Sequence, residues 1–271
     1  MEPVAPAAPP ESANPRDGRG TGLGQPDERF GHEGKDEGLM STALVIGARN
    51  LGFAIIERLL ADGWNVTGGA VSAETLDRVR GAGAHPVEMD VTDQASVLAA
   101  LEEVGARSGR VDLVVNAASP YAGGGGGPFG GGNLADSDPD SFERWTTSPA
   151  RGAYAALSAS ARFLKAQGGP ATVIQISGGS ARRAMPGRGL WAAGAFGVRA
   201  LTQAAALELR EEEIHVALLV VDAGIDRSGD GDARTADQPS LAGAVAYLAS
   251  QTPRAMTHEL QVTPALDNWT P

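Results

Sequence analysis

The chain has 271 residues, with 33 acidic against 22 basic side chains and a formal net charge of −11. This excess of negative charge argues against a surface that binds nucleic acid or an anionic membrane. The absence of cysteine excludes disulfides, thiolate metal sites and thiol catalysis. No apolar run reaches the roughly 20 residues of a membrane-spanning helix, and the N-terminus lacks the pattern of a secretory signal. We therefore expect a cytoplasmic protein without nucleic-acid or membrane partners.

Residues 1–40 differ in composition from the rest of the chain. They are rich in proline, glycine and charge and contain few large apolar side chains. Such a segment buries too little apolar surface to offset the entropy lost on ordering, so we predict a disordered tail. Apolar sequence begins abruptly after Met40, which we interpret as the natural start of the protein. Residues 41–271 are predicted to form a single domain.

Short runs rich in Val, Ile and Leu alternate with helical patterns through this domain. The predicted strands are 42–47, 64–69, 85–90, 111–118, 171–177 and 215–222. The predicted helices, with apolar residues three and four apart, are 53–63, 73–83, 93–109, 140–167 and 189–213. Alternating strands and helices predict an α/β fold with a parallel, doubly wound sheet. The glycine-rich stretch 122–132 is predicted to be a mobile loop.

A short turn connects the first predicted strand to the first predicted helix. It reads Gly47-Ala48-Arg49-Asn50-Leu51-Gly52. In this context, backbone N–H groups at the start of a helix bind the pyrophosphate of a dinucleotide. The turn lacks a full G-x-G-x-x-G pattern, so it becomes informative only together with motifs elsewhere in the chain.

The order of these motifs resembles the short-chain dehydrogenase/reductase family. After the glycine turn come DVTD at 90–93, VNAAS at 115–119, ISGGS at 176–180, WAAGAFGVRAL at 191–201 and VDAGI at 221–225. Residues 241–262 are similar to the last helix and strand of that family. The resemblance covers residues 41–268 and implies a three-layer Rossmann fold with a sheet of about seven parallel strands.

The resemblance also implies a nicotinamide cofactor, held in part by Gly47, Arg49, Asn50, Leu51 and Gly52. Asn50 takes the place of the middle glycine of the family motif, and Asn tolerates a left-handed conformation better than most residues. Arg49 lies where members that prefer NADP often carry a basic residue, since a guanidinium pairs well with a 2′-phosphate. The stretch that follows the second strand has neither an acid nor a second basic residue. We therefore favour NADP over NAD.

Two further motifs match cofactor-contacting positions of the family. Asp90, followed by Val91, matches an aspartate that contacts adenine, and Asn116, Ala117 and Ala118 match the family's N-N-A-G stretch. The alternative interpretation is structural, because glycines and small residues also allow a helix and a strand to pack closely.

The family's catalytic residues are missing. In the family, a Tyr and a Lys four residues apart share one helix face, and the Lys lowers the pKa of the Tyr that exchanges the proton. Here Trp191 and Ala195 hold these positions, while Gly178 and Pro149 replace the catalytic Ser and Asn. Neither of the chain's two lysines follows a tyrosine by four residues. Carbonyl reduction by the family's usual mechanism is therefore not expected.

Four side chains near the expected pocket remain as candidates. Ser177 and Ser180 flank the empty serine position, where a hydroxyl could orient a carbonyl. Trp191 offers an indole N–H, which donates a hydrogen bond but keeps its proton near neutral pH. Asp222 could act as a general base, although an aspartate at the end of a strand more often caps a loop. No metal-ligand spacing is present.

Three arginines precede the Trp191 helix: Arg182, Arg183 and Arg188. In so acidic a protein they could bind a carboxylate or a phosphate, which points to an anionic small-molecule substrate. Arg188 is also a catalytic candidate, because its guanidinium could polarise the substrate. The alternative is that they pair with aspartates and glutamates of the same chain.

Three functions stay open. The first is an NADP- or NAD-dependent oxidoreductase with an unusual site for a small carbonyl or alcohol. The second is a non-redox enzyme, such as a cyclase, dehydratase or isomerase, and the third is a non-catalytic dinucleotide-binding sensor or scaffold. The helix predicted over 189–213 has small residues on most sides, which favours close helix packing and predicts a homodimer or homotetramer.

Overall fold

The computed structural model describes residues 40–119, 127–227, 229 and 231–267. In this part, one parallel sheet has the strand order β3-β2-β1-β4-β5-β6-β9. Its strands are β1 (Thr42–Ile46), β2 (Asn65–Ala70), β3 (His85–Glu88), β4 (Leu113–Asn116), β5 (Ala171–Gly178), β6 (Ile214–Val221) and β9 (Glu259–Val262). The direction of winding reverses between β1 and β4, and ligands of doubly wound sheets bind at such a point.

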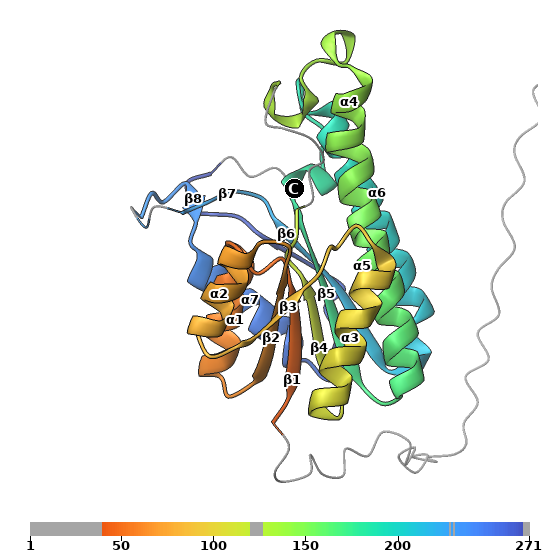
Figure 1. Ribbon diagram of the computed structural model, residues 1–271. Helices are drawn as coiled ribbons and strands as arrows, with labels where there is room; N and C mark the ends of the chain where they lie inside the picture. The colour runs from red at the N-terminus through yellow and green to blue at the C-terminus, as the bar shows by residue number, and fades with distance from the viewer. Residues whose placement is uncertain (1–39, 120–126, 228, 230, 268–271) are drawn as a thin grey trace, which may run out of the picture. The chain divides into compact units, whose positions relative to one another are not determined.

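Helices cover both faces of the sheet (Figure 1). One face carries α1 (Leu51–Ala61), α2 (Ala73–Gly81) and α7 (Gln238–Ala249), and the other carries α3 (Gln94–Ser108), α5 (Ser148–Gln167) and α6 (Gly189–Glu208). Two large apolar clusters and a small third one, between α5, α6 and β6, fill the spaces between the sheet and these layers. Every residue of β6 is buried, which explains why the strands read as unbroken apolar runs. The predicted three-layer Rossmann fold with about seven parallel strands is confirmed.

The predicted elements are present, with ends that differ by a few residues. The helix predicted over 140–167 consists of α4 (Pro139–Phe142), a π-helical turn (Glu143–Thr147) and α5. The helix predicted over 189–213 ends earlier, because α6 stops at Glu208 and a 3₁₀ turn (Arg210–Glu212) follows. A short parallel pair, β7 (Gly224–Ile225) with β8 (Thr235–Ala236), was not predicted, since two-residue strands show no periodicity.

Some predictions fall on residues outside this description. Residues 1–39 lie outside it, so the disordered tail and the start at Met40 stay predictions, as does the mobile loop over residues 122–126. Residues Phe129–Gly131 of the glycine-rich stretch form a 3₁₀ turn. No helix in the described part of the chain is long and apolar enough to cross a membrane.

The π-helical turn packs closely against α6. An ideal Cβ on Gly194 would lie 2.5 Å from the carbonyl oxygen of Trp145 and 3.0 Å from the Cα of Thr146. The Thr146 hydroxyl also donates a hydrogen bond of 2.8 Å to the carbonyl oxygen of Leu190. Since these neighbours are backbone atoms, they cannot rotate away from an added methyl group. Gly194 therefore sets the distance between α6 and the turn.

Gly194→Ala is expected to lower the free energy of unfolding by about 1–3 kcal/mol, because the added methyl group overpacks this contact. Gly243→Ala on α7 is the matched control, since its nearest neighbour is the Arg58 side chain at 3.5 Å. The control should gain up to about 1 kcal/mol from the better helix propensity of alanine. Urea unfolding of both variants measures the difference, and equal stability of the two would contradict the packing described.

Candidate functional site

The turn after β1 touches the segment after β4. Gly47 has a φ of +84°, and an ideal Cβ there would lie 2.6 Å from both the Cα and the N of Ala118. Gly52 is equally restricted, because a Cβ on it would overlap the carbonyl oxygen of Gly47. Only glycine satisfies both the positive φ and the close approach at Gly47. The two chain segments therefore meet at the switch point of the sheet.

Asn116 holds the other side of this contact. Its side chain is buried, its Nδ2 donates to Gln175 Oε1 at 2.9 Å, and its Oδ1 accepts from the Ala118 N–H at 3.2 Å. The Ala117 N–H donates to the carbonyl oxygen of Ile46 at 2.9 Å. Asn116 thus fixes the Ala117–Ala118 segment against the glycine turn.

The first turn of α1 presents backbone donors. The side chain of Asn50, the N-cap residue, makes no capping hydrogen bond. No described residue accepts a hydrogen bond from the N–H of Leu51 or Gly52. Such donors at a helix N-terminus, together with the helix dipole, favour a bound anion.

The predicted left-handed conformation of Asn50 is wrong. Its φ is −108°, so the left-handed conformation that asparagine tolerates is not used. The turn is one residue shorter than the family motif, and the positive φ falls on Gly47. Asn50 is nevertheless the residue directly before α1, and from this position it is predicted to contact the cofactor.

A second arginine lies beside Arg49. Arg78, on α2, donates a hydrogen bond of 3.2 Å from Nη1 to the Arg49 carbonyl oxygen. The guanidinium carbon of Arg78 also lies 4.2 Å from the centroid of the Phe53 ring. The sequence analysis missed this residue, because it considered only the stretch directly after β2. The sequence showed two arginines, Arg78 and Arg80, in the helix after β2. Their spacing did not predict which of them contacts the glycine turn.

The Asp90 carboxylate is partly occupied by its own loop. Its Oδ1 accepts from the N–H of Thr92 at 2.9 Å and from the Thr92 hydroxyl at 2.8 Å. Asp90 is exposed and the following Val91 is buried. This pair lies just past the end of β3, at the same edge of the sheet as the glycine turn.

Trp191 packs over Gly178, the residue that we predicted at the position of the catalytic serine. An ideal Cβ on Gly178 would lie 3.1 Å from Cζ2 of the Trp191 indole. The space that a serine side chain would need is therefore in contact with the indole. Successive residues of a strand point to opposite faces, so the side chain of Ser177 points away from Trp191. Ser180 is buried in a 3₁₀ turn (Gly179–Ala181) just after β5.

Trp191 belongs to an aromatic cluster formed by Phe129, Trp145 and Trp191. Phe129 meets the two indoles edge-on, with ring centroids 4.7 Å from Trp191 and 5.0 Å from Trp145. The guanidinium carbon of Arg188 lies 5.4 Å from the centroid of the Phe129 ring and 6.0 Å from that of Trp191. The cluster thus places one exposed cation and no acid–base group beside Gly178.

Asp222 is engaged by neighbouring donors. Gln261 Nε2 donates to its Oδ2 at 3.0 Å, and Arg183 Nη2 lies 3.5 Å from its Oδ1. Its carboxylate also lies against Gly179, where any Cβ would overlap Oδ1. These contacts make Asp222 a fixed link between the ends of β5, β6 and β9. They favour its role in holding the loop over that of a general base.

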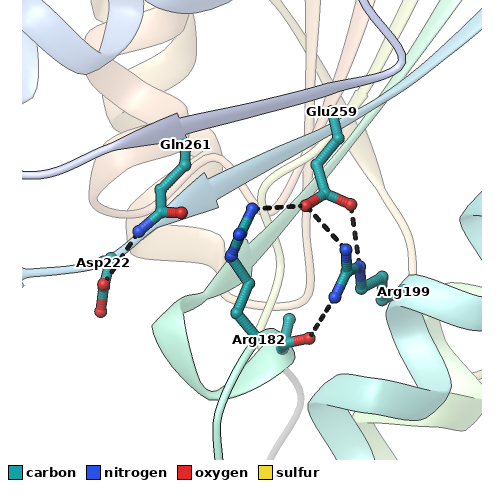
Figure 2. Close-up of polar contacts among 6 residues, drawn as sticks. Arg182, Arg199, Asp222, Glu259 and Gln261 are labelled. Carbon is teal, nitrogen blue, oxygen red and sulfur yellow. Dashed lines mark hydrogen bonds and ion pairs between the residues drawn. The ribbon is translucent and has the colours of Figure 1, made fainter. Parts of the chain in front are cut away.

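Glu259 is held by two arginines (Figure 2). Arg199 binds both carboxylate oxygens, with Nε–Oε2 at 2.8 Å and Nη2–Oε1 at 3.0 Å. Arg182 Nη1 donates to Oε1 at 3.0 Å. Of the three predicted anion-binding arginines, Arg182 and Arg183 therefore form ion pairs with acids of this chain. Arg188 forms none among the described residues.

Neither His215 nor a cluster of metal-binding side chains contributes to this site in the described residues. His215 is buried near the start of β6, at the end of that strand opposite to Asp222. Burial lowers its pKa below the usual value for a histidine. In the described residues, no group of three or more His, Cys, Asp or Glu side chains could hold a metal ion.

Comparison with known proteins places the chain in a family. The sequence profile described as short chain dehydrogenase matches residues 41–226. This protein is a member of the short-chain dehydrogenase family. The trans-4-hydroxycyclohexanecarboxylate dehydrogenase of Sinomonas cyclohexanicum is 29% identical over 238 residues, covering 79% of this chain and 88% of the relative. The sorbitol dehydrogenase of Cereibacter sphaeroides is 29% identical over 208 residues, covering 74% and 77%.

Solved structures share the fold. An alcohol dehydrogenase from the archaeon Thermococcus sibiricus, complexed with 5-hydroxy-NADP, has a TM-score of 0.71 and 22% identity, covering 85% of this chain and 99% of that one. A metagenomic short-chain oxidoreductase in complex with NADP has a TM-score of 0.66 and 25% identity, covering 84% and 98%. This short-chain dehydrogenase therefore shares its fold with these structures over most of the length of each.

Arg199→Ala is expected to lower the free energy of unfolding by about 1–3 kcal/mol, because it removes both charge-assisted bonds to a mostly buried carboxylate. Arg182→Ala removes one bond and should cost less than about 1 kcal/mol. Thermal and urea unfolding of the two variants measure the difference. A larger loss for Arg182→Ala would contradict the assignment of Arg199 as the main partner of Glu259.

Proposed function

We propose that this short-chain dehydrogenase binds NADP(H) and acts as an oxidoreductase on a small carbonyl or alcohol compound, at a site without a Tyr–Lys pair. The observation that carries the proposal is the geometry of the turn between β1 and α1. The turn presents N–H donors that no described residue accepts, beside the arginine that the family motif associates with NADP. Relatives solved with NADP or 5-hydroxy-NADP share the fold and support the same cofactor class.

The residues present fit a dinucleotide. Gly47 and Gly52 allow the close backbone contacts that shape the turn, and the N–H groups of Leu51 and Gly52 would bind the pyrophosphate. Asn50 and the Ala117–Ala118 segment would line the same crevice. Asp90 and the backbone of Val91 would contact adenine at the end of β3. Arg49, which is exposed and forms no ion pair among the described residues, would receive a ribose phosphate.

The protein's own side chains limit the chemistry at the other end of the crevice. Bound NADPH would supply a hydride. A carbonyl oxygen that receives a hydride also needs a proton, and neither Trp191 nor Gly178 provides one near neutral pH. Ser180 would orient the substrate oxygen by hydroxyl donation, whereas Ser177 points away from Trp191, and water would supply the proton. The exposed Arg188 would attract an anionic substrate. Turnover should therefore be slow on simple carbonyls and faster on substrates that carry a carboxylate or phosphate.

A second candidate function is dinucleotide binding without turnover, as a sensor or scaffold. The contact between Trp191 and Gly178 favours it, because the indole occupies the space next to the position of the lost serine. The two candidates share the cofactor site and differ only in whether a substrate enters beside the aromatic cluster.

Calorimetric titration with NADPH and NADH tests the shared part of both candidates. The wild type should bind NADPH more tightly than NADH. Arg49→Ala should weaken NADPH binding by roughly tenfold, because a hydrogen bond to a charged group is lost, and should leave NADH binding nearly unchanged.

Turnover assays with a panel of neutral and anionic carbonyl compounds then separate the two candidates. Oxidation of NADPH by any of them supports the enzyme, and binding without oxidation of NADPH supports the sensor. A wild type that binds neither nucleotide would contradict both candidate functions, the oxidoreductase and the sensor.

We also propose that the protein is a homodimer or homotetramer formed through α6. The outward side of this helix is mostly apolar. Its exposed apolar residues are Ala193, Phe196, Ala200, Ala204 and Leu207, and its exposed polar residues are Gln203 and Glu208. Phe196 and Leu207 are 43% and 71% exposed. An apolar strip that contains three alanines on an exposed helix lets a second copy approach closely.

Ala200→Glu should dissociate this assembly, because it places a charge in the middle of the strip. Ala73→Glu, at an exposed position of α2 on the other face of the sheet, is the matched control and should not change the assembly. Light scattering after size-exclusion chromatography gives the mass of each variant. A wild type that is monomeric at every concentration would show that α6 is not an interface.

A further inference from the structure

Arg188 is an exposed cation just before α6. Among the described residues, none accepts a hydrogen bond from its guanidinium and no acid pairs with it. The neighbouring Arg182, by contrast, binds Glu259 (Figure 2). Arg183 lies 3.5 Å from the Asp222 carboxylate. The loop after β5 therefore presents one guanidinium without an acid partner in the described chain, at the edge of the sheet where ligands bind.

Aromatic rings hold this cation. The guanidinium carbon of Arg188 lies 5.4 Å from the centroid of the Phe129 ring and 6.0 Å from that of Trp191. Both distances allow cation–π attraction. A contact with a ring face restricts the side chain without using an N–H donor. The planar fork that binds a carboxylate through two parallel hydrogen bonds therefore stays available.

Backbone contacts bring Phe129 and Arg188 together, although the two residues are far apart in the sequence. Gly132 forms an isolated parallel bridge with Arg188. An ideal Cβ on Gly130, whose φ is +81°, would lie 3.0 Å from Cγ of Arg188 and 3.1 Å from its Cα. Glycine allows both the positive φ and this close approach. The segment that carries Phe129 is therefore laid directly against the segment that carries the cation.

The surface around the cation is apolar. Phe129 meets the indoles of Trp191 and Trp145 edge-on, yet the residue is 55% exposed. Leu134 and Met185, from the same two segments, are 69% and 41% exposed. An exposed apolar surface beside a cation without an acid partner fits a ligand that has an apolar body and a negative charge.

This surface begins at the substrate end of the crevice. Cζ2 of Trp191 lies 3.1 Å from an ideal Cβ on Gly178, and the Trp191 ring lies 4.7 Å from that of Phe129. Ser180, which would orient the substrate oxygen, follows Gly178 by two residues. A ring that extends from this hydroxyl toward Arg188 would rest on Phe129 and Trp191.

We propose that Arg188 and Phe129 form a subsite for a carboxylate attached to an aromatic ring, and that the substrate is an aromatic keto acid or the matching hydroxy acid. This inference rests on the proposed function and names the substrate class of that site. Arg188 binds the carboxylate, and the ring packs against Phe129. A carboxylate fits better than a phosphate monoester, because one guanidinium neutralises only one of the two phosphate charges.

Three ketones separate the charge of such a ligand from its ring. 4-Acetylbenzoate has both, 4-acetylbenzamide keeps the ring without the charge, and 4-oxopentanoate keeps the carboxylate without the ring. If Arg188 only packs on the aromatic cluster, its loss affects the acid and the amide equally. If it binds the carboxylate, its loss affects the acid alone.

The full chain is titrated by calorimetry with each ketone, with and without saturating NADP⁺, which cannot reduce a ketone. Arg188→Gln should weaken binding of 4-acetylbenzoate by roughly tenfold or more, since charge-assisted hydrogen bonds are lost, and should leave 4-acetylbenzamide nearly unchanged. Arg162→Gln, at an exposed position in the C-terminal half of α5, removes the same charge elsewhere. This matched control should change the binding of none of the three ketones.

Phe129→Leu tests the ring, because it keeps an apolar side chain and removes the aromatic face. It should weaken both ring compounds by about threefold or more and leave 4-oxopentanoate nearly unchanged. The acid should bind to the wild type at least about tenfold more tightly than 4-oxopentanoate or 4-acetylbenzamide.

The outcomes for the subsite and for the proposed function are distinct. Equal weakening of the acid and the amide by Arg188→Gln, or equal affinity of the wild type for 4-acetylbenzoate and 4-oxopentanoate, would overturn the proposal. A wild type that binds NADPH but none of the ketones would also overturn it, with the cofactor site intact. A wild type that binds the acid but neither NADPH nor NADH overturns the proposed function and the role of the acid as a substrate, whereas the carboxylate subsite stands.

Discussion

The close approach of Gly47 to Ala118 is the contact on which the site depends. It joins the segments that leave β1 and β4, the two central strands between which the winding of the sheet reverses. The positive φ of Gly47 aims the chain into α1, and the buried Asn116 holds the opposite segment through Gln175. Backbone hydrogen bonds and the buried Asn116–Gln175 bond therefore hold both segments in place. The free N–H donors of Leu51 and Gly52, for which no described residue is an acceptor, follow directly after this turn.

The region around Trp191 is built by packing a small residue against a large one. An ideal Cβ on Gly178 would lie 3.1 Å from Cζ2 of the Trp191 indole. Phe129 and Trp145 extend the same apolar surface. No tyrosine of the chain is followed by a lysine four residues later, so the predicted loss of the Tyr–Lys pair depends on residue types alone.

Some of this arrangement could be predicted from local patterns. The strands and helices follow from apolar periodicity, and the glycine turn follows from its place between a strand and a helix. The missing Tyr–Lys pair follows from the scarcity of lysine alone. The conformation assigned to Asn50 was wrong, because a turn one residue shorter moves the positive φ to Gly47. Arg78 was missed for a related reason: its relation to Arg49 depends on how α2 lies against α1, which no spacing along the chain describes.

The sequence by itself determined the fold class, the order of the strands and helices and the absence of a tyrosine followed by a lysine four residues later. Each of these depends on residue types at short separations along the chain. Only the tertiary structure decided which charges are neutralised. Arg182 and Arg199 meet Glu259 from segments far apart in the chain, and Arg183 meets Asp222 across the ends of two strands. Arg78 donates instead to the backbone carbonyl oxygen of Arg49. Ion pairs depend on distances of a few ångströms between such segments, and those distances are fixed only when the sheet and its helices pack.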